Sequence, residues 1–243
     1  MAAPALEAQN LTLSWNELIV VEGISIHVGE GEIACIVGRS GCGKTTLFHA
    51  LAGLEQPDCG KVLLHGEDIT GVPGRVSYML QKDLLLPSRS ILDNAALPLV
   101  LHGVGRDEAR AKARALFPTF GLEGTENLWP AQLSGGMRQR AALLRTYLME
   151  NDVVLLDEPF SALDAITRVE LRHWFAGMVR ELGLSALVIT HDIDEALDLG
   201  SRVYVLDGMP RQGRISRIVG ETDVVPDGAD RARRELAELL GMA

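Results

Sequence analysis

A short glycine-rich stretch, residues 38–46, has the residue types and the spacing that bind phosphate. It reads Gly-Arg-Ser-Gly-Cys-Gly-Lys-Thr-Thr and fits the pattern G-x-x-x-x-G-K-[ST] of phosphate-binding loops. Its glycines let the backbone bend and bring N–H groups close to phosphate oxygens, and the lysine adds a positive charge. The Thr45 hydroxyl is a suitable ligand for Mg²⁺. The residues expected to contact nucleotide are Gly38, Arg39, Ser40, Gly41, Cys42, Gly43, Lys44, Thr45 and Thr46.

The segments on either side of this stretch are the ones that a phosphate-binding loop requires. Residues 32–37 are apolar and predict a buried strand that leads into the loop. Residues 46–52 predict a helix, whose N-terminal partial positive charge would also face the phosphates. The alternative is an ordinary glycine-rich turn. The order of strand, loop and helix favours the phosphate-binding interpretation.

A second set of candidate residues follows an apolar run at residues 153–156, where Asp157 and Glu158 stand side by side. Carboxylates at the end of a buried strand are costly unless they have a partner or a function. Asp157 can hold Mg²⁺ through water, and Glu158 is placed to polarise an attacking water. The alternative is a strand end with capping acids.

Gln81 and His191 also follow predicted strands, at residues 75–79 and 185–190. Phosphoryl transfer depends mostly on positioning and on neutralisation of charge. Gln81 could reach Mg²⁺ or water, and His191 could contact the γ-phosphate. Taken one at a time, each is more often a plain loop residue or a structural histidine, so both assignments depend on the other motifs.

Another anion site is predicted at Ser134, Gly135 and Gly136, which open a predicted helix within the run Leu-Ser-Gly-Gly-Met. Free N–H groups and a hydroxyl at a helix start bind anions. Two separate phosphate sites in one chain favour an active site that is shared between two chains. Trp15 is either a flat platform for a purine ring or a partly buried packing residue.

Together these residues resemble the motif set of the ATP-binding subunits of ABC transporters. The resemblance implies an α/β fold: a P-loop NTPase core with an N-terminal antiparallel β subdomain and an inserted α-helical subdomain. It also implies a head-to-tail dimer, with ATP between one chain's Lys44 loop and the other's Ser134, and with Asp164 at the seam. The matching residues, which span most of the chain, are Trp15, residues 38–46, Gln81, residues 133–137, residues 153–158, residues 161–164 and His191.

Within this family, residues 81–99, 133–140 and 190–196 resemble the nitrate, sulfonate and taurine importers. Departures at Leu80, Ser88 and the pair Thr146-Tyr147 leave importers of thiamine precursors or other small organic molecules open. The resemblance implies a membrane permease, an extracytoplasmic substrate-binding protein and a position at the cytoplasmic face of the membrane. An exporter subunit or a non-transport ABC ATPase is the alternative.

Composition is consistent with this interpretation. A length of 243 residues suits one domain, with a helical subdomain at about residues 88–148 and a tail at about residues 221–243. A net charge of -10 argues against nonspecific binding to nucleic acid. No apolar run is as long as a membrane span, and the N-terminus lacks the features of a signal peptide. The three cysteines form neither a disulfide framework nor a zinc pattern.

The remaining elements follow from hydrophobic periodicity. A helix is expected at residues 193–199, capped by Asp192. Residues 203–206 are expected to form the last clear strand, and residues 230–240 a solvated, charged helix. Residues 83–87 form an apolar loop, and the resemblance to ABC ATP-binding subunits implies that this loop receives a coupling helix of a permease. Further strands are expected at residues 18–21, 24–28 and 61–65, and further helices at 91–101, 106–117, 137–149 and 165–182.

Overall fold

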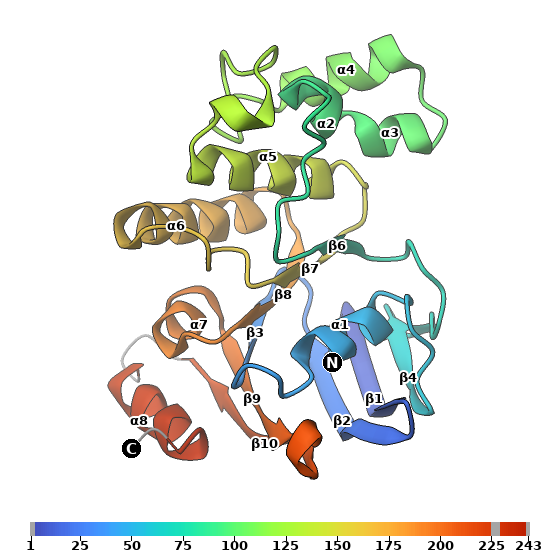
Figure 1. Cartoon of the computed structure of the whole chain (residues 1–243), viewed down its shortest axis with the longest axis vertical. Helices are drawn as coiled ribbons and strands as arrows, with labels where there is room; N and C mark the ends of the chain where they lie inside the picture. The colour runs from blue at the N-terminus through green and yellow to red at the C-terminus, as the bar shows by residue number, and fades with distance from the viewer. Residues whose placement is uncertain (1–2, 225–228, 242–243) are drawn as a thin grey trace.

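One ten-stranded sheet runs through the computed structural model, which describes residues 3–224 and 229–241. Its strand order is β5-β4-β1-β2-β10-β9-β3-β8-β7-β6 (Figure 1). β1, β2, β4 and β5 pair antiparallel, and β6, β7, β8, β3 and β9 pair parallel. The α/β core and its N-terminal antiparallel β part are therefore as predicted. The strands are β1 Leu6–Trp15, β2 Leu18–Val28, β3 Ile33–Val37, β4 Cys59–Leu64, β5 Glu67–Asp68, β6 Ser77–Met79, β7 Val153–Asp157, β8 Ser185–Thr190, β9 Arg202–Met209 and β10 Arg214–Asp223.

The helices form separate groups around this sheet. Figure 1 shows α2, α3, α4 and α5 together at one end of the molecule, beyond β6 and β7, while α1 lies beside β1. Their bounds are α1 Lys44–Leu51, α2 Ile91–Ala95, α3 Leu97–Leu101, α4 Arg106–Ala115, α5 Gly135–Tyr147, α6 Ala165–Glu181, α7 Ile193–Leu199 and α8 Ala229–Leu239, with short 3₁₀ turns at Pro130–Gln132 and Pro210–Gln212. The subdomain bounds 88–148 and 221–243 stay a prediction.

The core has two parts, one on each face of the sheet. Ile33, Cys35 and Val37 of β3 pack toward the helices α2 to α8, and Ala34 and Ile36 pack toward α1 and the antiparallel strands. Side chains of a strand alternate between faces, so β3 is buried on both of them. This double burial explains why the sequence of β3 is a continuous apolar run.

Several sequence predictions about elements were wrong. The strands expected at residues 18–21 and 24–28 form one strand, β2. The single helix expected at residues 91–101 is interrupted at Ala96, because Pro98 has no N–H to continue the helical ladder. Residues 203–206 are not the last strand: β9 is longer, and β10 pairs antiparallel with it. The many charged and polar residues of β10 hide its periodicity. β10 ends at Asp223.

The terminal helix α8 is present, but it is not a fully solvated helix. Ala232, Leu236 and Leu240 are buried, because a spacing of four residues places them on one helix face. Leu236 and Leu240 join the same core as Ala196 and Leu199 of α7. Residues 225–228 and 242–243 of the predicted tail lie outside the described residues.

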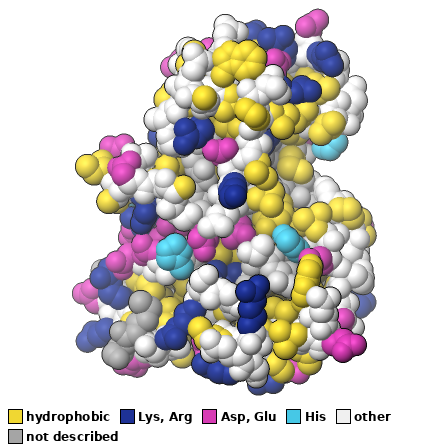
Figure 2. Space-filling model, viewed as in Figure 1, with side chains coloured by type: hydrophobic (Ala, Val, Ile, Leu, Met, Phe, Trp, Pro, Cys, Tyr) yellow, Lys and Arg dark blue, Asp and Glu magenta, His cyan; other side chains and the backbone are white. Residues whose placement is uncertain are grey.

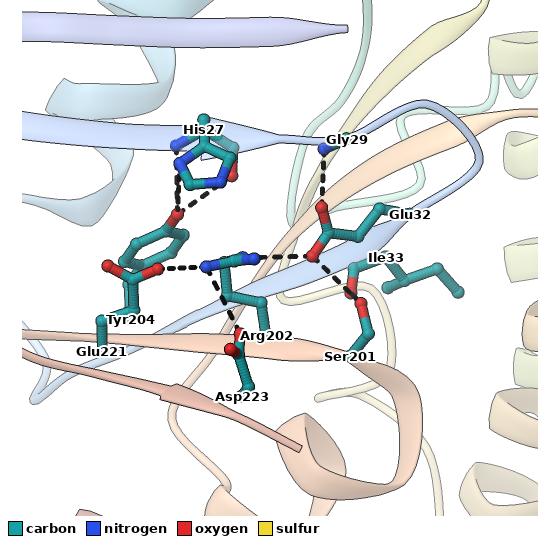
Figure 3. A network of polar contacts seen from close by, with 9 residues as sticks. All are labelled: His27, Gly29, Glu32, Ile33, Ser201, Arg202, Tyr204, Glu221 and Asp223. Carbon is teal, nitrogen blue, oxygen red and sulfur yellow. Dashed lines mark hydrogen bonds and ion pairs between the residues drawn. The ribbon is translucent and has the colours of Figure 1, made fainter. Parts of the chain in front are cut away.

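A polar network ties β3, β9 and β10 together at the edge where β3 begins (Figure 3). The Glu32 carboxylate accepts hydrogen bonds from the Gly29 N–H at 2.6 Å, the Ser201 hydroxyl at 3.0 Å and the Arg202 Nε at 3.2 Å. Arg202 also pairs with Glu221 and Asp223. The network lies at the opposite end of β3 from the glycine-rich loop, and we assign it a structural role.

The three cysteines differ sharply in accessibility, which gives a direct test of the fold. Cys35 and Cys42 are fully buried, and burial raises the pKa of both thiols, whereas Cys59 is exposed. Only thiolates react readily with disulfide reagents. We expect one fast-reacting thiol per folded chain in a colorimetric thiol assay, and all three after unfolding in urea. Cys59→Ser should remove the fast phase. Rapid labelling of Cys42 in the folded Cys59→Ser chain would contradict the buried position of that loop residue.

Candidate functional site

The glycine-rich loop joins β3 to α1 in the predicted order. Gly43 has a φ of 96° and precedes α1, whose first turn carries neither a side-chain cap nor an acidic residue. The first N–H groups of a helix have no partner within it and favour an anion. The Lys44 Nζ donates hydrogen bonds to the carbonyls of Gly38 at 2.7 Å and Arg39 at 3.0 Å. The loop thus has the donors and the curvature that phosphate binding requires.

Close packing adds a second reason for glycine in this loop. A Cβ at Gly38 would lie 2.5 Å from the Leu206 carbonyl oxygen, and one at Gly43 would lie 2.7 Å from Val20. Val20 belongs to β2, which is paired with β1 in the hairpin that carries Trp15. The Trp15 side chain is 60% exposed at the end of β1. The exposed ring therefore belongs to the same hairpin that packs on the loop.

A hydroxyl at the end of this loop contacts a carboxylate at the end of β7. The Thr45 Oγ1 donates a hydrogen bond to the Asp157 Oδ2 at 3.0 Å. Burial raises the pKa of the Asp157 carboxyl, and the hydrogen bond from Thr45 opposes that shift. A threonine hydroxyl and a carboxylate are oxygen ligands of the kind that Mg²⁺ prefers. The pair fits a magnesium site.

Three side chains from separate segments converge beside this pair. The Glu158 Oε2 accepts a hydrogen bond from the Gln81 Nε2 at 3.1 Å and lies 3.3 Å from the His191 Nδ1. Each residue follows the carboxyl end of one of the neighbouring parallel strands β6, β7 and β8. The structure therefore brings together the residues that the sequence predicted as catalytic. The arrangement can hold a water and take a proton from it.

The Glu158 backbone is unusual for a residue other than glycine. Its φ is 45°, in the left-handed region, and its N–H donates a hydrogen bond to the Ile189 carbonyl at 2.9 Å. Such a conformation costs on the order of 1 kcal/mol and persists where the surroundings fix it. The turn at Glu158 directs its carboxylate toward Gln81 and His191.

The residues of the predicted second anion site, Ser134 to Gly136, lie at the start of α5, next to the start of α6. Ser134 caps α5, with its hydroxyl accepting the Met137 N–H at 3.3 Å, and Asp164 caps α6. A Cβ at Gly136 would lie 2.8 Å from the Thr167 methyl group. Gly136 therefore allows the two helix starts to pack together. Hydrogen bonding from Thr167 lowers the pKa of the Asp164 carboxyl and keeps it charged.

These two helix starts are not joined to the glycine-rich loop of the same chain. Among residues 3–224 and 229–241, no hydrogen bond or ion pair links residues 133–137 to residues 38–46. Figure 1 shows α5 in the upper part of the molecule and α1 in the lower part, with β6 and β7 between them. Figure 2 shows acidic side chains and a histidine on the surface between α6 and α7. Within the described residues, the two segments are therefore separate.

The family assignment follows from comparison with known proteins. A family profile described as ABC transporter matches residues 21–161, more than half of the chain. The chain belongs to the ABC transporter family. It carries the ATPase domain of that family, with the mixed α/β fold predicted from its motifs.

Named relatives of this ABC ATPase are import proteins. The formylaminopyrimidine import ATP-binding protein ThiZ of Halalkalibacterium halodurans is 43% identical over 86% of this chain and 79% of that protein. The taurine import ATP-binding protein TauB of Pseudomonas aeruginosa is 39% identical over 84% of this chain and 80% of that protein. The aliphatic sulfonates import ATP-binding protein SsuB 2 of Burkholderia cenocepacia is 42% identical over 88% of this chain and 77% of that protein.

Solved structures agree with the fold. The dimeric ABC transporter cassette MJ0796 has a TM-score of 0.76 and 26% identity, covering 90% of this chain and 99% of that one. The cassette MJ1267 has a TM-score of 0.83 at 19% identity, with 98% of both chains covered, and supports the fold alone.

Residues that fix the apolar 83–87 loop in this ABC ATPase were missed from sequence. Arg145 of α5 donates hydrogen bonds to the carbonyls of Asp83 at 2.5 Å and Leu84 at 2.8 Å, and Arg138 pairs with the Asp83 carboxylate at 3.3 Å. The loop borders a cleft of about 480 Å³ that is also lined by Gln81, Gly135 and Ser161. The arginines lie four and eleven residues after Ser134, and only the folded chain shows that they reach back to this loop. They connect α5 to the loop that follows Gln81.

Proposed function

We propose that this chain is the ATP-hydrolysing subunit of an import system that moves a small solute through a separate membrane permease. The convergence of Gln81 and His191 on Glu158 carries the proposal for hydrolysis. The import direction rests on the named relatives, which are import proteins for formylaminopyrimidine, sulfonates, taurine, sulfate or Fe³⁺. These solutes differ widely; we propose that the solute here is a nitrate-, sulfonate- or taurine-like ion or a related small organic molecule, as the resemblance of residues 81–99, 133–140 and 190–196 implies.

In the proposed reaction, the Glu158 carboxylate orients the attacking water and accepts its proton. A carboxylate held next to a hydrogen-bond donor and an imidazole is well placed for this task. His191, whose side chain is 58% exposed, faces the position of the γ-phosphate, and Gln81 orients the same water. Lys44 and the loop N–H groups neutralise the phosphate charge. Trp15 stacks on the adenine ring.

The donor set at Thr45 and Asp157 fits Mg²⁺, with Gln81 as a further ligand. The bound ion would neutralise charge on the β- and γ-phosphates. Thr45 and Asp157 come from different elements, α1 and β7, and are already in contact at 3.0 Å. That contact holds the Thr45 hydroxyl, which belongs to the phosphate-binding loop, beside the Asp157 carboxylate.

The raised pKa of Asp157 gives this site a testable pH dependence. The folded chain favours the protonated Asp157 carboxyl. Above the pKa that this carboxyl has in the unfolded chain, it therefore lowers the free energy of unfolding, and below that pKa it does not. We expect Asp157→Asn to increase the free energy of unfolding at about pH 7 and to change it little at about pH 3.5. Urea unfolding of both proteins at the two pH values measures this. Lower stability of Asp157→Asn at neutral pH would show that the carboxylate is stabilising instead.

The complete site is proposed to form between two chains. Ser134, Gly135 and Gly136 of one chain would close on the nucleotide held by the Lys44 loop of the other. Asp164 would lie at the seam and couple the two sites; it caps α6, whose Thr167 packs against Gly136. The separation of these segments within one chain and the dimeric cassette among the solved relatives support the proposal. ATP would close this dimer, and hydrolysis would reopen it.

The proposed membrane partner docks on the 83–87 loop. Leu84 is 51% exposed there, although its loop is held firmly by Arg138 and Arg145. Exposed apolar residues on a fixed loop are typical of a protein contact. Among the described residues, no helix is long and apolar enough to span a membrane. By its similarity to the import ATP-binding proteins, we propose that the chain acts at the cytoplasmic face of the membrane, with a permease and an extracytoplasmic substrate-binding protein as partners.

Affinity purification from detergent-solubilised membranes of the source organism tests this function, with partners identified by mass spectrometry. A multi-span permease, with or without a binding protein, supports an importer, and the binding protein can then be screened for its solute. Recovery of only soluble partners would support a non-transport ABC ATPase. A fused or efflux-type membrane partner would support an exporter.

A matched pair of variants tests the docking loop. Leu84→Glu places a charge on the 83–87 loop, and Leu54→Glu places one at another leucine that is 57% exposed. We expect the first to reduce permease recovery at least tenfold and the second to leave it unchanged, because burying an unpaired charge at an interface is costly. Equal recovery with both variants would place the permease contact elsewhere.

A further inference from the structure

The terminal helix α8 is anchored to α7, the helix that follows His191 of the candidate site. Leu236 and Leu240 pack in the same core as Ala196 and Leu199 of α7, the helix that follows His191. Arg233 of α8 pairs with Asp194 in the first turn of α7. Leu239 packs closely over Gly220, where a Cβ would lie 2.3 Å from its methyl group. The helix is thus fixed to α7 by apolar and ionic contacts.

The other end of α8 contacts the glycine-rich loop. The last carbonyls of a helix have no partner within it. Leu240 and Gly241 directly follow α8, and the carbonyls of both accept hydrogen bonds from the Arg39 guanidinium, the second at 3.4 Å. A cation at a helix C-terminus is stabilising. The side chain of Arg39 therefore contacts the residues at the C-terminal end of α8.

The backbone of the same residue is part of the phosphate-binding loop. The Arg39 carbonyl accepts hydrogen bonds from the Lys44 Nζ at 3.0 Å and from the Cys42 N–H at 3.3 Å. One residue thus connects the end of α8 to the ammonium group that would meet the β- and γ-phosphates. A shift of α8 would displace the Arg39 side chain and, through the backbone, the Lys44 contact.

We propose that Arg39 is a positioning residue that couples nucleotide binding in the loop to docking of the C-terminal turn of α8. This inference rests on the proposed role of residues 38–46 in binding nucleoside triphosphate. With α8 docked, the loop loses less conformational freedom when it binds phosphate, so affinity rises. Thermodynamic linkage then requires nucleotide to stabilise the docked turn by the same factor.

The test uses the full chain and a fluorescent ATP analogue in four proteins: wild type, Arg39→Gln, Arg39→Lys and Arg231→Gln. Arg231 is an exposed arginine of the same helix and serves as the matched control. Nucleotide affinity is measured by titration, and hydrogen exchange of residues 229–241 is measured with and without nucleotide. Exchange of β7 reports whether each variant is folded.

We expect nucleotide to slow exchange at the Leu240 and Gly241 amides in wild type and in Arg231→Gln. Arg39→Gln should bind nucleotide about fivefold more weakly and lose this protection, and Arg39→Lys should keep part of both effects. If the wild type binds nucleotide and hydrogen exchange of α8 does not change, the coupling is wrong and the proposed nucleotide binding stands. Protection of α8 in Arg39→Gln equal to wild type also overturns the coupling. A wild type that binds no nucleotide overturns the proposed function and the coupling together.

Discussion

Glu158→Gln is expected to slow ATP hydrolysis by roughly 10²–10⁴-fold while leaving ATP binding intact, because positioned general bases contribute about that factor. Glutamine keeps the shape of the side chain and its hydrogen-bonding capacity toward Gln81, but it cannot take a proton from water. The nucleotide loop is untouched, since Lys44, Thr45 and Asp157 stay in place. The variant should therefore bind ATP and remain in the closed dimer.

Three measurements separate this outcome from simple damage. Phosphate release gives the rate, titration with labelled ATP gives the affinity, and size-exclusion chromatography with ATP gives the dimer fraction. Glu181→Gln, at an exposed acid that ends α6, is the matched control and should behave as wild type. Turnover by Glu158→Gln at the wild-type rate would remove Glu158 from its proposed role. Weakened ATP binding would assign it to nucleotide retention instead.

The positions of Glu158, Gln81 and His191 could be predicted because they follow strands of a parallel sheet. The strands β7 and β8 were predicted with their observed bounds, Val153–Asp157 and Ser185–Thr190, from continuous apolar runs. Strands that are buried on both faces give such runs, and their carboxyl ends lie along one edge. Residues directly after them are therefore brought together even though they are far apart in the sequence.

The contacts of long polar side chains were not predictable in this way. Arg39 and Arg145 each reach the backbone of a distant segment, α8 in one case and the 83–87 loop in the other. Carbonyl acceptors are present at every residue, so sequence offers no signal for which one an arginine will meet. The strand β10 was missed for a related reason, since its exposed residues mask its alternation. Gly136 was assigned to anion binding, and its packing against Thr167 became evident only in three dimensions.

Mixing two inactive variants gives the sharpest expected result for the shared site. Lys44→Ala removes the phosphate-binding charge, and Ser134→Arg places a bulky cation at the start of α5. Each variant alone should be inactive, because both sites of either homodimer carry the same defect. Ser134→Arg should still bind ATP in its own loop, since Ser134 has no described contact with residues 38–46.

In a head-to-tail dimer of the two variants, one site contains both defects and the other contains neither. Random pairing makes about half of the dimers mixed, and each mixed dimer has one intact site of two. Phosphate release should therefore recover to roughly a quarter of the wild-type rate if the sites act independently.

The control is a mixture of Lys44→Ala with Glu158→Gln, whose defects both lie in the part of the site that one chain contributes. In their mixed dimers each site keeps one defect, so no activity returns. No recovery with Ser134→Arg would place the complete site within a single chain, whereas recovery requires Lys44 and Ser134 to meet across two chains.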